Sequence, residues 1–293
     1  MDSKGISMAN SVAETEQWSQ VIRPKSGLFD FNLKELLHYK FLMYLFVRRD
    51  FVAQFKQTVL GPMWFFIQPL FTTGIYSIIF GSLAKIPTDG VPQPVFYLAG
   101  TTLWNYFSSC LGGTGSVFIA NAGMFGKVYF PRLTVPIATV ITRLFTFVIQ
   151  MFLFLVVYFV YLARGAAMSP NIWLLLLPIM LVHTAILGIA VGMWSSALTV
   201  KYRDLGQLIS FGVSLWMWAT PIVYPLSLVP KKYRMLASLN PVSPIVEIFR
   251  YSFTGAGSLP VMQYLVSLIV TAVLLIIGLI LFHRAEQTFI DVV

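Results

Sequence analysis

The chain has 293 residues, of which 57% are hydrophobic and only 11% are charged. Soluble domains carry roughly 25% charged residues, so this composition excludes an ordinary soluble domain and predicts a protein that lies mostly in lipid. The formal net charge of +9 does not indicate nucleic-acid binding, because in a membrane protein Lys and Arg first report topology.

The first sixty residues are expected to stay in the cytoplasm, where the chain is made. Residues 1–30 are polar and lack the apolar run of a signal peptide, and we expect a flexible cytoplasmic extension there. Residues 31–60 predict an amphipathic helix in the membrane interface, with Asn32 as its N-cap and Glu35 three residues on. Its apolar residues follow a 3.6-residue period: Leu33, Leu36, Leu37, Phe41, Tyr44 and Leu45. A simple topology anchor is the alternative interpretation.

Six segments are apolar over the roughly 20 residues that a spanning helix needs. They are residues 62–84, 94–120, 134–163, 172–199, 205–224 and 261–282. An even number of spans places both termini on one side. That side carries thirteen Lys and Arg residues against six on the other, so both termini, including the tail 285–293, are predicted to be cytoplasmic.

The second and third spans have features of their own. The second carries small residues that let helices approach closely, namely Gly112, Gly113, Gly115 and Ser116. The third, residues 134–163, is roughly 45 Å long as a helix, whereas the hydrocarbon core is about 30 Å thick. We therefore expect it to protrude into the cytoplasm, with Arg143 at or near that boundary.

The outer loop between the fifth and sixth spans, residues 225–260, predicts a re-entrant helical hairpin. Its two helical pieces, residues 230–239 and 244–254, are too short to cross a membrane. The loop carries one acid, Glu247, and a set of basic residues that runs against the positive-inside trend: Lys231, Lys232, Arg234 and Arg250.

Motifs for chemistry are missing from the sequence. The histidines His38, His183 and His283 lie in different segments, and no metal-site or nucleophile motif occurs. Gly126-Lys127 is not a phosphate loop, because Val128 replaces the required Ser or Thr and Asn121 replaces the first glycine. No Asp or Glu lies inside a predicted span, which argues against an ion-coupled transporter. We predict no cofactor or metal in this chain, and uphill transport would need energy from another subunit.

Four stretches together resemble a known family. RRDFVAQFKQTVLGPMWFFIQPL (48–70), MFGKVYFPR (124–132), KYRDLGQL (201–208) and WMWATPIVYP (216–225) resemble permease subunits of type-2 ABC exporters. The nearest branch exports lipid-linked polysaccharide such as O-antigen, capsule or teichoic acid. The resemblance covers the chain from about Phe31 onward. It implies a homodimer of all-α, six-span permeases in the bacterial inner membrane. Two separate ATPase subunits would bind ATP and Mg²⁺.

The resemblance also implies roles for segments. The loop between spans two and three corresponds to a coupling helix that docks on the ATPase. Its candidate residues are Asn121, Met124, Phe125, Gly126, Lys127, Val128, Tyr129, Phe130 and Pro131. The helix at 31–60 resembles the family's interface or gate helix, and the outer hairpin resembles its paired periplasmic helices. The implied substrate is a polysaccharide on undecaprenyl pyrophosphate, threaded between two permeases.

Basic residues suit the pyrophosphate, because guanidinium groups bind phosphate in a bidentate manner. Candidates at the cytoplasmic mouth are Arg48, Arg49 and Lys56. Candidates at the outer side are Lys231, Lys232 and Arg234. Contact with phospholipid headgroups is the alternative role for both sets.

Aromatic residues could stack on translocating sugar rings. The candidates are Trp64, Phe65, Phe66, Trp104, Tyr106, Trp216 and Trp218. Packing and interface anchoring are the alternative roles. Two other functions stay open: a type-2 exporter of small lipids or drugs, and a membrane glycosyltransferase. The second is disfavoured, because the available acids, Asp50, Asp89, Asp204 and Glu247, do not cluster in the sequence.

Overall fold

The computed structural model describes residues 33–292, except Tyr129, Arg203, Lys231, Arg234, Met235, Leu236 and Ser238. The expected extension at residues 1–30 lies outside the described residues. All regular elements in the described part are helices, as predicted. In order, they are α1 (Leu33–His38), α2 (Lys40–Phe55), η1 (Gly61–Met63), α3 (Trp64–Tyr76), η2 (Ser77–Leu83), α4 (Gln93–Gly115), α5 (Val117–Ala120), α6 (Ala122–Phe125), α7 (Thr134–Ala163), η3 (Ile172–Leu176), α8 (Leu177–Lys201), α9 (Leu205–Ala219), η4 (Leu226–Leu228), α11 (Val242–Thr254) and α12 (Val261–Val292).

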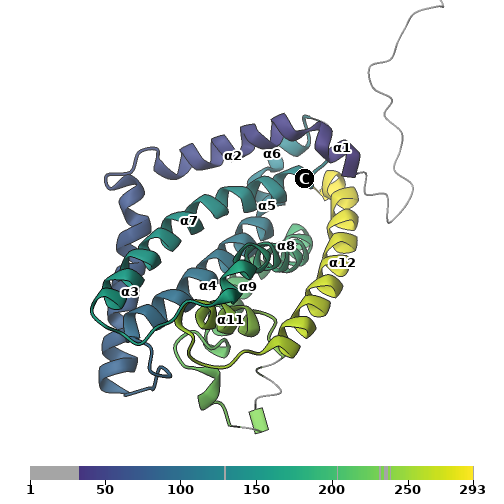
Figure 1. Cartoon of the computed structure of the whole chain (residues 1–293). Helices are drawn as coiled ribbons and strands as arrows, with labels where there is room; N and C mark the ends of the chain where they lie inside the picture. Colours follow the sequence, from purple (N-terminus) through teal and green to yellow (C-terminus); the bar gives the residue numbers. More distant parts are fainter. Residues whose placement is uncertain are drawn as a thin grey trace, which may run out of the picture. The chain divides into compact units, whose positions relative to one another are not determined.

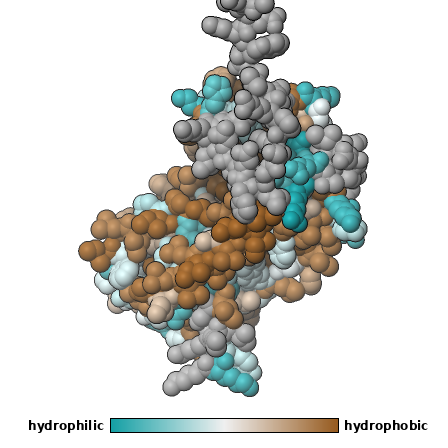
Figure 2. Space-filling view, turned by 90° about the vertical axis from the view of Figure 1, so that its right-hand side faces the viewer, coloured by the Kyte–Doolittle hydropathy of each residue, from teal (hydrophilic) through white to brown (hydrophobic). Residues whose placement is uncertain are grey.

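Four helical stretches have the length and composition of membrane spans: residues 61–83, 134–163, 172–201 and 261–287. They agree closely with the first, third, fourth and sixth predicted spans, and α7 begins and ends at the predicted residues. Figure 2 shows hydrophobic side chains in a broad band across the middle of one face, with hydrophilic ones nearer its upper and lower ends. This pattern is typical of a multi-pass membrane protein.

The second and fifth predicted spans differ from these four. Helix α4 has 23 residues but carries many polar ones and lies at the centre of the fold, packed by α7 and α8 (Figure 1). Helix α9 has 15 residues and rises only about 22 Å, less than a hydrocarbon core of about 30 Å. It ends at Ala219 instead of continuing to Tyr224, and the non-helical segment that follows buries Ile222 in the core.

The interhelical contacts of α8 depend on glycine. A Cβ atom on Gly192 would lie 2.5 Å from the Cβ of Thr114 and 2.8 Å from the carbonyl oxygen of Leu111, both on α4. A Cβ on Gly278 of α12 would lie 2.6 Å from the carbonyl oxygen of Ala190. Such small residues let the three backbones approach closely in a protein that has little else to drive helix association in lipid.

The predicted interface helix is present as two helices, α1 and α2, that meet at Tyr39. Figure 1 shows α2 running along one end of the molecule, near α5, α6 and the C-terminal end of α12. The predicted apolar residues Leu37, Phe41 and Tyr44 are exposed, whereas Phe46 on another side of α2 is buried against the body. Helix α2 therefore has two apolar sides: one packs against the body of the protein, and the other is exposed on its surface.

Helix α11 lies at the other end of the fold (Figure 1). Twelve of its thirteen residues are buried, which fits a short re-entrant helix that is enclosed by longer ones. It ends at Gly255, whose φ of 68° is the left-handed conformation that glycine adopts without strain. Too little of residues 230–239 is described to test the first piece of the predicted hairpin.

Candidate functional site

A stripe of small and polar residues runs along one face of α4, which is otherwise buried. Its members are Asn105, Ser108, Ser109, Gly112, Gly113 and Ser116, and each is partly or fully exposed. Their spacing of three and four residues places them on one side of a helix. The remaining faces of α4 are buried against α7 and α8. We call this set the α4 stripe. It is a continuous polar surface in a protein whose other exposed helix faces are largely apolar.

Three cavities open along the α4 stripe. The first, of about 270 Å³, lies between α4, α8 and α9. The second, of about 290 Å³, lies between α3, α4 and α7. The third, of about 330 Å³, lies between α2, the segment from α4 to α6, and α7. Ser108 lines the first and second cavities, and Ser116 lines the first and third, so the stripe connects all three.

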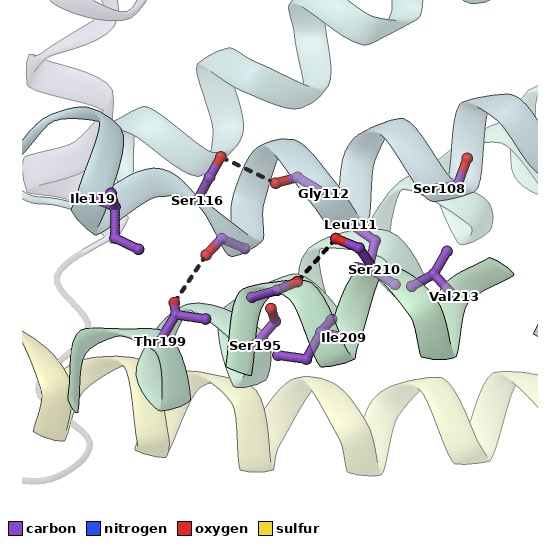
Figure 3. A pocket seen from close by; sticks show the side chains of 12 residues that line it. Ser108, Leu111, Gly112, Ser116, Ile119, Ser195, Thr199, Ile209, Ser210 and Val213 are labelled. Atoms are coloured by element: carbon purple, nitrogen blue, oxygen red, sulfur yellow. Dashed lines mark hydrogen bonds between the residues drawn. The ribbon is translucent and has the colours of Figure 1, made fainter. Parts of the chain in front are cut away.

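The first cavity is lined without any charged side chain (Figure 3). Its hydroxyl groups are bonded to backbone carbonyls: Ser116 donates to Gly112 at 3.1 Å and Thr199 donates to Gly115 at 3.3 Å. Figure 3 shows Ser195, Ile209 and Val213 completing the wall between the helices. Because each hydroxyl oxygen can still accept a hydrogen bond, this wall offers neutral polar groups next to apolar ones.

The second and third cavities share Arg143, a residue that the sequence analysis did not select as a binding residue. Arg48, Arg49 and Lys56, on and directly after α2, are all exposed, but only Arg49 lines the third cavity. Arg49 forms an ion pair with Asp50 at 2.8 Å and donates to Asn121 at 3.3 Å. The structure therefore separates Arg49 from the other two and places it beside Arg143.

The candidate aromatic residues do not gather on one surface. Phe65 and Tyr106 line the second cavity together. Trp104 is buried, and its ring packs against that of Trp216 at 6.4 Å, so core packing accounts for it. Trp64 and Trp218 are about half exposed, and Phe66 packs partly buried against the core.

The loop between α5 and α7 has buried aromatic residues and an exposed tip. We expected its apolar side chains to form a docking surface, but Phe125 and Phe130 are each only 5% exposed. They belong to a cluster of rings with Phe46, Phe118 and Phe282, in which Phe118 and Phe282 lie 4.7 Å apart. We call this the loop-anchor cluster.

The exposed part of the loop is Gly123 and the stretch Gly126–Val128, with Lys127 at its centre. Met124 and Pro131 are half-buried and Asn121 is buried, whereas Tyr129 lies outside the described residues. The selected residues thus divide into those that hold the loop and those that are presented by it.

A polar network missed at the sequence level holds the same loop to α12. The buried Arg132 donates to the backbone carbonyl of Glu286, and its Nε lies 3.9 Å from the Glu286 carboxylate. Its guanidinium also lies 5.5 Å from the centre of the Phe125 ring. Burial lowers the pKa of Arg132, and the Glu286 carboxylate opposes that shift. Residues 154 positions apart give no local signal of such a contact.

At the other end of the fold, Arg250 of the predicted outer hairpin is a buried residue, 3% exposed. Its guanidinium bonds Glu247 at 3.2 Å and the carbonyl oxygens of Pro221 and Ile222 at 3.0 and 3.3 Å. It also lies 3.6 Å from the centre of the Phe96 ring. The carbonyls are available because the chain leaves the helical conformation after α9. Burial raises the pKa of Glu247, which Arg250 partly offsets.

The other basic residues of the outer hairpin are described only in part. Lys232 is exposed, with its Nζ 5.6 Å from the ring of Tyr233. Lys231 and Arg234 lie outside the described residues.

Comparison with known proteins identifies the family. Residues 42–254 match the family described as ABC-2 type transporter, and this match covers well over half of the 293 residues. The chain belongs to the ABC-2 type transporter family. As an ABC-2 permease it is the membrane subunit of a transporter, and its family implies a partner ATPase.

Several curated proteins are similar to this permease along most of its length. The O-antigen export system permease protein RfbA of Klebsiella pneumoniae is 27% identical over 264 residues, covering 89% of this chain and 98% of the relative. RfbA of Myxococcus xanthus is 27% identical over 75% of this chain and 83% of the relative. The polysialic acid transport protein KpsM of Escherichia coli is 26% identical over 83% of this chain and 92% of the relative.

Proposed function

We propose that the chain is the permease subunit of an ATP-driven exporter that moves undecaprenyl-pyrophosphate-linked polysaccharide across the bacterial inner membrane. Two copies would work with two ATPase subunits, with both termini of each permease in the cytoplasm. The observation that carries this proposal is similarity to O-antigen permeases over almost the whole of both chains. A polysialic acid transport protein is also similar, and a polysaccharide is the substrate class that these names share.

The α4 stripe supports a sugar path. Sugar rings present hydroxyl groups that need hydrogen-bond partners and apolar faces that need none. The stripe and the first cavity supply Ser, Thr and Asn groups beside Leu, Ile and Val side chains. Neutral groups of this kind bind each sugar weakly, which suits a chain that must move on. Phe65, which is partly exposed in the second cavity, offers a ring for stacking.

The loop from Asn121 to Pro131 is the proposed coupling element. The exposed Gly126–Val128 tip would enter a groove of the ATPase, and Lys127 would meet an acidic group there. Phe125 and Phe130 act from inside, because the loop-anchor cluster ties the loop to α2 and α12. A displacement of the tip by the ATPase would therefore be transmitted to α2 and to α12.

The remaining basic residues are assigned to the two membrane surfaces. Arg48 and Lys56 on the exposed side of α2 would contact headgroups or attract the substrate at the cytoplasmic mouth. Lys232, together with Lys231 and Arg234, would do so at the outer surface.

Reconstitution tests the proposal directly. The permease and its ATPase, placed together in vesicles with lipid-linked glycan, are expected to translocate the glycan only when ATP is present. Export by the permease alone under a proton gradient would refute the proposal. Transport of small lipids or drugs but not of glycan would refute its substrate. A deletion strain should accumulate lipid-linked glycan on the cytoplasmic side of its membrane.

A further inference from the structure

Arg143 is a charged residue within the mostly apolar helix α7, and the described part of the chain supplies it with no ion pair. It is the tenth residue of α7, about 14 Å along a helix of 1.5 Å rise per residue. Its Nε atom is buried without a hydrogen-bond partner, and no ion pair joins the side chain to any residue in the described part of the chain. A basic residue in a spanning helix is costly and normally has a partner or a functional role. The missing partner is therefore to be sought in the cavities that Arg143 lines.

The packing around Arg143 leaves room for its guanidinium. A Cβ atom on Gly113 would lie 2.5 Å from Cγ2 of Thr139 and 3.6 Å from Nε of Arg143. Glycine at this position lets the guanidinium lie close against α4 at the edge of the α4 stripe. A larger residue there would push Thr139 or Arg143 aside.

A second guanidinium lines the same cavity. Arg49 reaches the third cavity from α2, and Arg143 reaches it from α7. Asp50 is the only acid among the lining residues, so the lining carries a net positive charge. The cavity volume of about 330 Å³ is within the usual range of ligand pockets, about 300–1,000 Å³.

The neutral residues of the cavity have few donors to spare. Thr139 and Thr142 donate to backbone carbonyls of α7, Ser116 donates to α4, and Asn121 donates to Val117. Gln54 also lines the cavity with an amide that can donate, and Arg49 already donates to Asp50 and Asn121. The charged donors left for a ligand are therefore the guanidinium of Arg143 and the remaining N–H groups of Arg49. A ligand bound by two guanidinium groups is an anion with several oxygens, because such groups match phosphate geometry with paired hydrogen bonds.

We propose that the third cavity is a binding site for a phosphate or pyrophosphate group, held between Arg49 and Arg143. The site itself follows from the two arginines and the cavity. Only the identification of the anion as the pyrophosphate end of the exported glycan rests on the proposed function. Arg143 and the cavity walls restrict the site to one place, where the half-exposed Arg49 of α2 meets α7.

Binding to the intact permease–ATPase complex in nanodiscs tests this site. The probes are undecaprenyl pyrophosphate and inorganic pyrophosphate, with phosphatidylglycerol in the nanodisc as a competing headgroup. Arg143→Gln and Arg49→Gln are each expected to weaken pyrophosphate binding at least tenfold. Arg48→Gln, on the same helix but outside the cavity, should weaken it much less, and the exposed Lys40→Gln is the matched charge control. Complex formation by gel filtration and rescue by Arg143→Lys exclude misfolding.

The outcomes separate the site from the proposed function. An equal loss of pyrophosphate binding in Arg48→Gln and Arg143→Gln would overturn the site. It would show that the overall positive charge of the surface attracts the anion and that no defined pocket binds it. Unchanged pyrophosphate binding by Arg143→Gln, with glycan export intact in the wild type, would overturn the site and leave the function standing. Arg143-dependent binding in a complex that exports no glycan would confirm the site and refute the function. A preference for undecaprenyl pyrophosphate over phosphatidylglycerol, lost in Arg143→Gln, would confirm the pyrophosphate as the ligand of this site, whereas displacement by phosphatidylglycerol would overturn that identification.

Discussion

Replacing Arg250 by alanine removes the cation from the buried pair at the end of the fold opposite α2. Arg250 and Glu247 are each 3% exposed and lie 3.2 Å apart. The guanidinium also bonds the carbonyl oxygens of Pro221 and Ile222, which hold the non-helical segment after α9. The substitution therefore removes the hydrogen bonds that link α11 to the segment after α9, and it leaves the proposed coupling loop unchanged.

The expected loss in the free energy of unfolding is about 3–5 kcal/mol, the usual cost of removing one partner from a buried ion pair. Two buried carbonyls would also lose a donor, and an unsatisfied buried group costs about 1–3 kcal/mol. Protonation of Glu247 would relieve part of both penalties. We therefore expect the total to stay within the range for the broken pair.

The loss should depend on pH in a defined direction. Burial already raises the pKa of Glu247, and Arg250 opposes that shift, so removing Arg250 raises the pKa further. A carboxyl group with a raised pKa in the folded state contributes stability below its unfolded pKa of about 4.3. That contribution is lost as the pH rises through the folded pKa. The deficit of Arg250→Ala relative to wild type should therefore grow from pH 5 to pH 8.

Denaturant titration of the purified permease in mixed micelles, followed by tryptophan fluorescence, measures this loss. Lys232→Ala, an exposed change on the same outer loop, should stay within about 0.5 kcal/mol of wild type. The double variant Arg250→Met, Glu247→Leu should recover most of the stability, because apolar residues can replace a buried pair. A single-variant loss below about 1 kcal/mol, or a double variant no better than Arg250→Ala, would refute the reasoning.

Further substitutions test the packing. Phe125→Ala should lower the free energy of unfolding by about 3–5 kcal/mol, because its ring is buried. The exposed Val128→Ala should change that free energy by no more than about 0.5 kcal/mol but weaken the pull-down of the ATPase. Similar stability losses in the two variants would contradict the division of the loop into buried and exposed residues. Gly192→Val should lower thermal stability by about 1–3 kcal/mol through overpacking against α4, and unchanged unfolding would argue against the close contact. Tyr158→Phe, which removes the 2.9 Å bond to the Phe253 carbonyl, should cost about 1–3 kcal/mol in the same assay.

Long apolar runs were the part of the fold that the sequence predicted best. Helix α7 begins and ends at the predicted residues, because a run of thirty mostly apolar residues bounded by Pro131 and Arg164 leaves little choice of helix ends. Helix α9 was predicted five residues too long, although the run stays apolar to Tyr224. Pro221 ends it, because proline disfavours the helical conformation at Thr220 and lacks the N–H that a helix needs. Arg250, distant in the sequence, binds the carbonyls that are freed after this point. Hydropathy contains no information about that partner.

The same limit applies to the candidate site. The loop at 121–131 was located from its charges and its resemblance, but the outward direction expected for its aromatic rings was wrong for Phe125 and Phe130. Their partners Phe46 and Phe282 come from α2 and α12, and only the tertiary fold brings these helices together. The structure has a short loop at the predicted place between α5 and α7, but which of its residues face out could not be predicted from the sequence.

At Arg143 the sequence and the structure give complementary information. The sequence places a single positive charge within a long apolar segment. Such a charge is stabilised by a position at the membrane boundary, by an acidic partner or by a ligand. No acid lies within the predicted spans, and the described structure supplies no ion pair. It supplies instead a second arginine, Arg49, across the same cavity. Asp50 pairs with Arg49 at 2.8 Å and so compensates one of the two positive charges. The charge of Arg143 stays uncompensated in this lining, and a bound phosphate group between the two arginines would supply the missing negative charge.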